Sequence, residues 1–499
     1  MHGSGSFYDA VVVGSGPNGL AAAIRLALEG LSVRVVEAEE TIGGGTRTKE
    51  LIKPGYFHDV CSAIHPMAIS SPFLRKLPLE NFGLNWIQPE YPLAHPLDDG
   101  RAVIMHRSID ETAASLGSDK QVYRRLLQPL ISNWDELAKD LLAPLQIPSN
   151  PIRMARFGLK ALQPAGRLVR KFGTEEAKAL FGGIAAHSIM DLDKPVTSAI
   201  GIVLGAAGHA AGWPLPEGGS YMITRSMASY FRSLGGEIET GFRVKHIDQL
   251  NPSKAVLFDL TPKQVLSIAG DRLPPGYRKL LEKFRYGAGV FKIDYILKAP
   301  VPWADPRCGK AGTVHLGGTY GEIAAAEKEM SRGGHPARPY VLLAQQSMFD
   351  PTRTPDMKHT LWAYCHVPNG STRDMTAEIE NQIERFAPGF RDVVEARLTM
   401  NAPQFEDYNA NYIGGDINGG VQDIWQLFSR PVSLRSSPFR IKSLLTPYTT
   451  PATGIYFCSS STPPGGGVHG MCGYHAAEAV LSREFGISAK SRRFSLSPA

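Results

Sequence analysis

Six residues near the N-terminus have the types and the spacing that bind a phosphate group. They are Gly14, Ser15, Gly16, Pro17, Asn18 and Gly19. In such a loop the first glycine permits a tight turn, the second lets a pyrophosphate approach bare backbone, and the third lets helix and strand pack closely. The helix that follows would add backbone N–H groups and the positive end of its dipole. The loop therefore predicts a site for a dinucleotide.

The elements that must position this loop are present on both sides of it. The β-branched run at residues 10–13 predicts a buried strand, residues 20–29 favour a helix, and residues 32–36 predict a second strand. Glu37 and Ala38 come next, and the Glu37 carboxylate can accept hydrogen bonds from ribose hydroxyls. Because a carboxylate would repel a 2′-phosphate, we expect an NAD-like or FAD-like adenosine.

A second glycine-rich segment decides between NAD and FAD. It contains Gly44, Gly45, Thr46, Arg47 and Thr48. Taken alone, it could be an ordinary flexible turn with a solvated arginine. The segment resembles the Gly-Gly-x-x-Arg-Thr/Ser motif of the FAD-dependent amine oxidase superfamily, which extends the fingerprint toward the pyrophosphate and the flavin. The resemblance implies FAD, and it places Arg47 at the pyrophosphate or in the lining of the site.

The C-terminal region repeats the strand, glycine-rich loop and helix pattern. Residues 454–458 predict a strand, residues 459–471 a loop and residues 472–481 a helix. The pattern resembles the C-terminal flavin motif of the phytoene dehydrogenase-like (carotenoid desaturase) branch of that superfamily. The resemblance implies cofactor contacts from Ser460, Gly466, Gly467, Val468, His469 and Met471.

Two internal segments extend the resemblance over the whole chain. Residues 218–244 resemble the middle FAD segment of the family, in which a strand valine meets the adenine through its backbone; that valine corresponds to Val244. Residues 409–420 and 428–431 look like the subgroup of the pyridine nucleotide-disulphide oxidoreductase domain 2 proteins. Among these groups, the chain is most similar to that subgroup.

The predicted fold class is α/β, with a discontinuous Rossmann-type FAD-binding domain and an α+β substrate domain that has a helical subregion. The FAD-binding domain is expected to combine residues 7–70, 214–259 and 445–486. The substrate domain is expected to combine residues 71–213 and 260–444. Residues 1–6 look like a vector-derived remnant, and residues 487–499 are expected to be a loose tail.

The resemblance also implies a reaction. Non-covalent FAD would accept a hydride at flavin N5 from an apolar or conjugated small-molecule substrate, with C–C desaturation of a polyene or isoprenoid-like compound as the leading reaction. The alternatives are a redox-neutral polyene isomerase that uses reduced flavin, amine-type C–N oxidation, and a flavoprotein with mainly a binding or assembly role. A second fingerprint and a CxxxxC pair are absent from the sequence, which argues against a disulphide reductase with its own NAD(P)H domain.

Two histidines are candidates for acid–base chemistry. His469 lies in the loop expected to meet the flavin, where it could act as a base or only cap the backbone at a helix start. His58 could face the substrate or be structural. With Cys61 and His65 it has the spacing of part of a zinc site, but no fourth ligand lies nearby, so no metal is predicted. Tyr412, Trp425 and Phe428 could line an apolar tunnel or be core residues.

Composition and charge exclude several classes of protein. With 53 basic and 47 acidic residues the net charge is +6, without the concentrated basic face that nucleic acid would require. Five scattered cysteines fit a reducing, cytoplasmic location, and no apolar run reaches the length of a membrane span. Residues 152–173 contain six basic residues and no acid among apolar side chains. They could contact a membrane surface peripherally, or form a solvated helix face.

Overall fold

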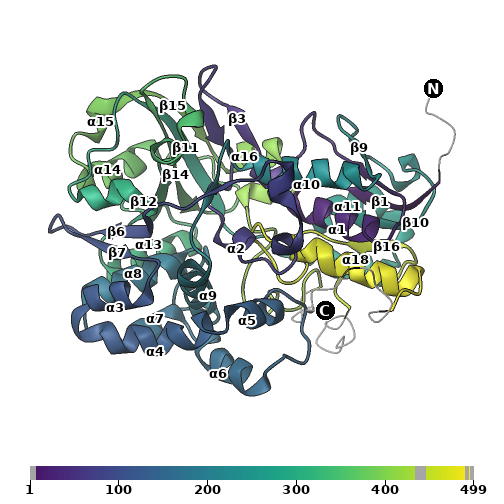
Figure 1. Ribbon diagram of the computed structural model, residues 1–499, viewed down its shortest axis with the longest axis horizontal. Helices are drawn as coiled ribbons and strands as arrows, with labels where there is room; N and C mark the ends of the chain where they lie inside the picture. Colours follow the sequence, from purple (N-terminus) through teal and green to yellow (C-terminus); the bar gives the residue numbers. More distant parts are fainter. Residues whose placement is uncertain (1–6, 433–445, 489–493, 495–499) are drawn as a thin grey trace.

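The β-branched runs near the fingerprint form the centre of a five-stranded parallel sheet, in the order β16-β10-β1-β2-β9. Its strands are β1 (Tyr8–Val13), β2 (Val33–Val36), β9 (Glu237–Glu239), β10 (Ser253–Phe258) and β16 (Ile455–Phe457). The computed structural model describes residues 7–432, 446–488 and 494. The strands come from three distant parts of the sequence and lie within residues 7–70, 214–259 and 445–486 (Figure 1). Residues 262–281, expected in the substrate domain, also pack on this sheet.

Helices cover both faces of this sheet. On one face lie α1 (Pro17–Ala27), α10 (Tyr221–Ser233) and α18 (Met471–Glu484); on the other lie α11 (Pro262–Ala269) and α12 (Pro275–Leu281). Helix α18 approaches α1 so closely that a Cβ at Gly473 would lie 1.8 Å from the backbone oxygen of Asn18. Since only glycine fits there, Gly473 fixes how the C-terminal helix packs beside the fingerprint helix.

A second sheet of seven strands has the order β15-β11-β14-β13-β12-β6-β7 and is antiparallel except for the parallel pair β12–β6. Its strands are β6 (Tyr91–Pro96), β7 (Ala102–Met105), β11 (Gly289–Leu297), β12 (Ala311–Leu316), β13 (Val341–Ala344), β14 (His359–Val367) and β15 (Val394–Met400). The helices around it in the later half of the chain are α13 (Tyr320–Ser331), α14 (Thr376–Phe386), α15 (Phe390–Val393) and α16 (Ala402–Tyr408).

A helical layer packs below this second sheet (Figure 1). Its members are α3 (Ile109–Ser115), α4 (Lys120–Ile131), α5 (Trp134–Leu141), α6 (Pro151–Ala161), α7 (Ala165–Val169), α8 (Glu175–Ala186) and α9 (Thr197–Ala210). The helical subregion expected from the apolar spacing is therefore present, and the α/β fold class is confirmed. Glycines let α8 and α9 approach each other, since a Cβ at Gly201 would lie 2.8 Å from the Phe181 ring.

Short elements connect the two domains. They are the pairs β3 (Thr48–Glu50) with β4 (Phe57–Asp59) and β5 (Trp86–Ile87) with β8 (Leu215–Pro216), and the short helix α2 (Pro66–Ile69). None of the helices in the described part of the chain combines the length and apolarity needed to cross a membrane. The expected remnant at residues 1–6 and most of the expected loose tail lie outside the described residues. Within that tail, the Phe494 ring packs edge-on against Phe73.

Candidate functional site

One large cavity is lined by residues of both domains and has a volume of about 1190 Å³. Ligand pockets are typically about 300–1,000 Å³. The cavity therefore has room for a large cofactor together with a second molecule. Its lining changes along its length, from glycine-rich backbone in the first domain to apolar side chains in the second.

The predicted phosphate-binding loop between β1 and α1 lines one end of this cavity. Gly14 has a φ of +104°, which favours glycine, and a Cβ at Gly19 would lie only 2.1 Å from the Gly14 carbonyl oxygen. Helix α1 begins at Pro17, so its positive end is directed at the cavity wall. The side-chain oxygen of Asn18 is buried there without a hydrogen-bond partner in the described structure.

Glu37 is tied to this loop by its own hydrogen bonds. One carboxylate oxygen accepts from the backbone N–H and the hydroxyl of Ser15, at 3.0 and 2.6 Å. The other accepts from the guanidinium of Arg47 at 3.2 Å. Both residues line the cavity. Arg47 therefore lies where the resemblance places it, but its charge is balanced by Glu37, so it is a paired cation and not a free one.

The second glycine-rich segment packs directly on the first. A Cβ at Gly44 would lie 3.3 Å from the Gly16 Cα, and a Cβ at Gly45 would lie 2.2 Å from the Tyr412 hydroxyl. The Thr46 hydroxyl closes the turn by donating to the Gly43 carbonyl at 2.8 Å. These close approaches show that the segment is packed into the cavity wall. This favours a cofactor-binding motif over an ordinary flexible turn.

The loop before α18 brings His469 to the cavity. Its Nδ1 accepts from the backbone N–H of Met471 at 3.0 Å, and the Ser71 hydroxyl donates to its carbonyl at 2.6 Å. Its Nε2 is buried without a hydrogen-bond partner in the described structure, and burial lowers the pKa of His469 to about 4. The ring is therefore neutral near pH 7. Its Nδ1 caps backbone as an acceptor, so the proton of the neutral ring is on Nε2, which is a donor without a partner in the described structure.

The structure brings most of the predicted site residues together. The cavity wall contains Gly14, Ser15, Gly16, Pro17, Asn18, Glu37, Ala38, Gly44, Gly45, Thr46, Arg47, Val244, Ser460, Gly466, Gly467, Val468 and His469. Four predicted residues are not part of that wall, namely Gly19, Thr48, Met471 and His58. Gly19 and Met471 support that wall from outside the cavity. Gly19 packs closely on Gly14, and the Met471 N–H donates to His469, as described above. Thr48 donates to Asp59 at 2.7 Å.

Two sequence-based expectations about local structure need correction. The strand expected to carry Val244 ends at Glu239, because Gly241 turns the chain with a φ of +71°. Val244 still lines the cavity, from a segment whose Phe242 N–H donates to the Glu37 carbonyl at 2.9 Å. Among the three aromatics considered for a tunnel, Tyr412 and Phe428 line the cavity, whereas Trp425 is 54% exposed and does not.

His58, Cys61 and His65 point to different partners. His58 Nδ1 lies 3.6 Å from an Asp294 carboxylate oxygen, beside the buried ion pair of Lys292 with Asp294. His65 Nε2 lies 2.8 Å from the Ser220 hydroxyl. Within the described ranges, no group of three or more metal-ligating side chains converges. The zinc-like spacing therefore does not correspond to a cluster in space.

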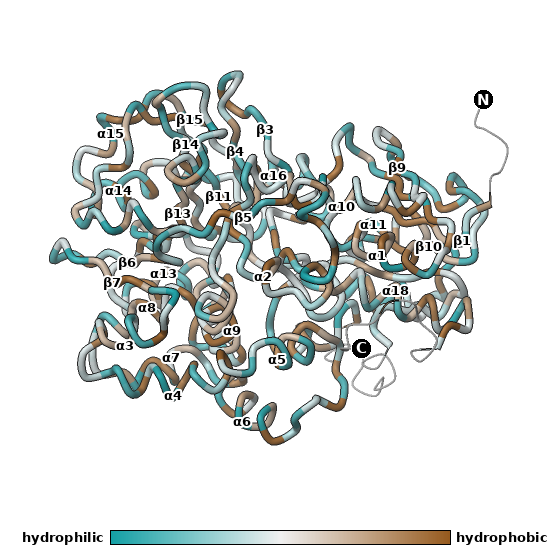
Figure 2. Tube along the Cα trace, viewed as in Figure 1, coloured by the Kyte–Doolittle hydropathy of each residue, from teal (hydrophilic) through white to brown (hydrophobic). Residues whose placement is uncertain are grey.

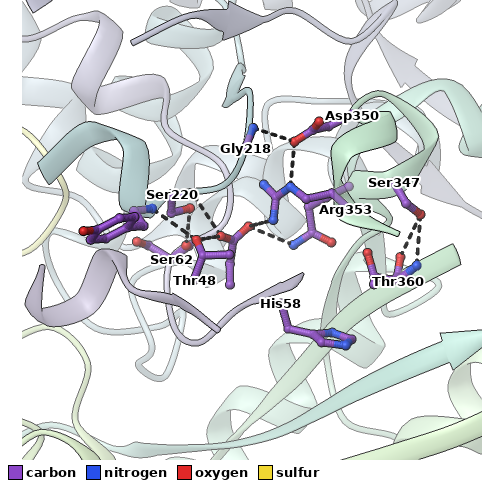
Figure 3. Close-up of polar contacts among 12 residues, drawn as sticks. Thr48, His58, Ser62, Gly218, Ser220, Ser347, Asp350, Arg353 and Thr360 are labelled. Atoms are coloured by element: carbon purple, nitrogen blue, oxygen red, sulfur yellow. Dashed lines mark hydrogen bonds and ion pairs between the residues drawn. The ribbon is translucent and has the colours of Figure 1, made fainter. Parts of the chain in front are cut away.

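A buried ion triad joins the two domains next to the cavity. Arg353 donates to Asp350 at 2.7 Å and to Asp59 at 3.0 Å, and all three side chains are fully buried. Asp59 also accepts from the Ser220 backbone N–H at 2.8 Å. Figure 3 shows the guanidinium enclosed by these contacts, while His58 lies apart from them. The triad has no signal in the sequence, since Asp59 and Arg353 are 294 positions apart.

Asp259 is a second residue that the sequence analysis missed. It follows β10, lines the cavity, and accepts from the Gly19 backbone N–H at 2.9 Å. A Cβ at Gly16 would lie 2.7 Å from the same carboxylate oxygen. Burial raises the pKa of Asp259 well above its usual value, and the Glu37 charge adds to this. Burial therefore disfavours the carboxylate anion at this position beside the phosphate-binding loop.

The substrate-domain half of the cavity is apolar. Ile200, Val203 and Leu204 of α9 face Leu342, Trp362 and Tyr364 of the large sheet across it. Among the described lining residues, the carboxylates are Glu37, Glu39 and Asp259 at the dinucleotide end and Asp140, which binds Ser149, near α6. His187 also lines this half, and burial lowers its pKa to about 3, so it is neutral. This half therefore suits an uncharged apolar molecule.

Comparisons with known proteins agree with this geometry. The NAD(P)-binding Rossmann-like domain family matches residues 12–77. The pyridine nucleotide-disulfide oxidoreductase domain-containing protein 2 of Mus musculus is 26% identical over 557 residues, which cover 95% of this chain and 93% of that protein. A limonene dehydrogenase polypeptide of Castellaniella defragrans is 32% identical over 108 residues, covering 22% of this chain and 19% of that polypeptide.

Two solved structures share the fold. An oxidoreductase from Methanosarcina mazei has a TM-score of 0.64 at 17% identity, covering 95% of this chain and 100% of that one. Putrescine oxidase bound to putrescine has a TM-score of 0.60 at 17% identity, covering 96% of this chain and 100% of that one.

The residues of the first domain fit FAD. The fingerprint loop leaves bare backbone at Gly16 for a pyrophosphate, Asn18 leaves an unsatisfied buried oxygen, and burial disfavours the charged form of Asp259 beside the loop. The cavity then continues from Gly44 and His469 into the apolar half, where an FAD ring system would meet a substrate. The chain thus has an FAD-type dinucleotide-binding domain, homology to pyridine nucleotide-disulfide oxidoreductase domain-containing protein 2, and the fold of amine-oxidising enzymes.

Proposed function

We propose that this protein is an FAD-dependent oxidoreductase that removes a hydride from an apolar small molecule, most favourably in the C–C desaturation of a polyene or isoprenoid-like compound. The observation that carries the proposal is the cavity that joins a dinucleotide loop to an apolar chamber, in which the described lining has one carboxylate, that of Asp140 near α6. FAD, when bound non-covalently there, supplies a two-electron acceptor at flavin N5.

The residues of the chain would bind the cofactor, orient the substrate and shield both from water. The α1 N-terminus and the glycine loops hold the dinucleotide, while Glu37 fixes the loop that receives it. The walls from α9 and the large sheet hold the substrate and exclude water. Desaturation also releases a proton from the carbon beside the one that loses the hydride. That proton passes to water. His469 has a different role: because its Nδ1 accepts from the Met471 N–H, the neutral ring carries its proton on Nε2, which is a hydrogen-bond donor toward the flavin edge or a substrate oxygen.

The apolar chamber favours a hydrocarbon over a charged amine. A cationic diamine in this chamber would need carboxylate partners, and the described chamber wall between the dinucleotide end and α6 offers none. The matched limonene dehydrogenase polypeptide is named for an apolar isoprenoid substrate, whereas putrescine oxidase is named for a diamine. Oxidation of an uncharged, largely apolar amine is the second candidate, supported by the shared fold.

Anaerobic mixing of the FAD-loaded protein with two substrate panels tests the proposal. Isoprenoid and polyene hydrocarbons are expected to bleach the oxidised flavin absorption, with a product that has two hydrogens fewer by mass spectrometry. Bleaching by amines alone would replace desaturation with C–N oxidation. Turnover that occurs only after the flavin has been reduced, with no change in product mass, would instead indicate isomerisation. No response to either panel would overturn the enzymatic proposal and leave a binding role.

A further inference from the structure

The cavity reaches the protein surface between α6 and the segment that precedes it. Leu145 and Leu162 both line the cavity and are exposed to solvent, so they mark its opening. Phe157 and Ala161 of α6 continue the lining inward from this opening. Figure 1 shows α6 at the lower edge of the molecule, outside the rest of the helical layer. An apolar substrate that enters here passes directly along α6.

Exposed apolar side chains are concentrated around this opening. Ile147 is 91% exposed, Ile152 68% and Leu159 74%, in addition to Leu145 and Leu162. Figure 2 shows apolar positions on the outlying α6, where a solvated helix face would carry polar ones. Single exposed apolar residues are common on soluble proteins, but five of them within residues 145–162, two of which line the cavity opening, indicate an interaction surface.

Positive charge accompanies these apolar residues. The exposed Arg156 of α6 and Lys171, just beyond α7, form no ion pair in the described structure. Lys160 lies between them: its Nζ donates to the Arg125 carbonyl at 3.3 Å, and burial together with the nearby Lys171 charge lowers its pKa. Arg153 is the exception, since it pairs with Glu136 at 2.9 Å. The surface thus combines protruding apolar groups with uncompensated cations.

We infer that this surface docks on an anionic lipid bilayer, so that the opening of the cavity faces the acyl chains. The docking surface consists of Leu145, Ile147, Ile152, Leu159, Leu162, Arg156, Lys160 and Lys171. A surface of this composition binds the membrane interface because its apolar residues enter the acyl boundary while its cations meet anionic headgroups. The inference rests on the proposed function only for the substrate, which would then enter from the membrane and not from water.

Vesicle flotation of the FAD-loaded protein tests the docking without any assay of turnover. We expect the protein to float with vesicles of phosphatidylcholine mixed with phosphatidylglycerol, to bind pure phosphatidylcholine at least tenfold more weakly, and to be released in part by high salt. Failure to float with the anionic vesicles would overturn the inference.

Two pairs of variants locate the surface. Ile152→Ser with Leu159→Ser should weaken vesicle binding at least tenfold, whereas Met357→Ser with Leu398→Ser, which removes two exposed apolar residues elsewhere, should leave it unchanged. Arg156→Gln with Lys171→Gln should weaken it several-fold, against a charge-matched control of Lys279→Gln with Arg332→Gln. None of the eight residues lines the cavity, so flavin content should be equal throughout. Equal loss of binding in the variants and their controls would contradict the proposed site.

A fluorescent label reports insertion directly. All five native cysteines are buried, so Leu159→Cys can be labelled selectively with an environment-sensitive dye in the folded protein. The emission of this label should shift to the blue with anionic vesicles, and that of a labelled Met357→Cys should not. An unshifted Leu159→Cys label in floating protein would contradict docking through α6. Docking without flavin bleaching by any substrate would contradict the proposed function alone.

Discussion

The two halves of the cavity are lined by different parts of the chain, one by backbone and the other by side chains. The dinucleotide half consists of glycine loops and backbone, in which a single added Cβ at Gly19 would meet a carbonyl oxygen at 2.1 Å. The substrate half consists of side chains such as Leu204 and Trp362, which come from a helix and a sheet far apart in the sequence. The dinucleotide half therefore tolerates almost no change in the cofactor that it binds. The substrate half can change its substrate specificity through the size of its side chains alone.

The largest effect is expected at the buried ion triad, which lies outside the cavity wall and joins distant segments of the chain. Arg353→Met leaves the buried Asp59 and Asp350 carboxylates without their cation, which should cost about 3–5 kcal/mol of the free energy of unfolding. Chemical denaturation of this variant and of Arg332→Met, at an exposed position, measures the difference. Equal stability of the two variants would show that the triad does not stabilise the contact between these segments.

The next effect tests the role of His469 where the halves meet. His469→Ala removes the Nε2–H donor and should slow flavin reduction by substrate about 10²-fold, the lower end of the cost of losing one preorganised hydrogen-bond donor, while FAD stays bound. Anaerobic stopped-flow absorbance measures the rate. His475→Ala is the control, because His475 lies on α18, directly after the loop that carries His469, but does not line the cavity. An unchanged rate in His469→Ala would remove this residue from the mechanism.

A glycine substitution separates cofactor binding from substrate binding. Gly19→Ala forces the fingerprint turn apart, and overpacking of this kind costs about 1–3 kcal/mol. We expect a lower flavin-to-protein ratio in the visible spectrum. Gly276→Ala is the control, because a Cβ there meets nothing within 4 Å. Full flavin content in Gly19→Ala would contradict the close packing at the loop.

The reciprocal change fills the substrate half. Leu204→Trp places a larger side chain into the apolar chamber and should weaken substrate binding about tenfold, or about 1.4 kcal/mol. The flavin content should stay unchanged, since Leu204 belongs to α9 and not to the glycine loops. If this variant instead loses FAD, the two halves are not separate in function.

The smallest effect concerns the buried carboxyl of Asp259. Because burial raises its pKa, the folded protein loses stability as the pH rises from the usual carboxyl pKa of 3.8 toward the raised value. Asp259→Asn keeps an acceptor for the Gly19 N–H and removes this loss. We expect its Tm at pH 7 to be about 2–4 °C higher, with the difference vanishing near pH 4. A difference that grows toward low pH would contradict the assigned direction.

The same contrast explains what could be predicted from the sequence. The fingerprint, the Gly44–Gly45 turn and the C-terminal loop are local patterns whose backbone demands are visible as glycine spacing. The substrate half depends on tertiary packing. No local sequence pattern indicates that α9 and β14 line the same cavity, or that Arg353 contacts Asp59. Residue type alone did not predict the position of Trp425, because this aromatic residue was expected in the tunnel or the core and lies at the surface.

The visible absorption spectrum of the purified protein, recorded before and after denaturation, tests the central claim most directly. We expect the absorption bands of oxidised flavin in the native protein and release of free FAD into the supernatant on unfolding. A colourless protein that takes up no FAD when the cofactor is added would contradict the account of the cavity.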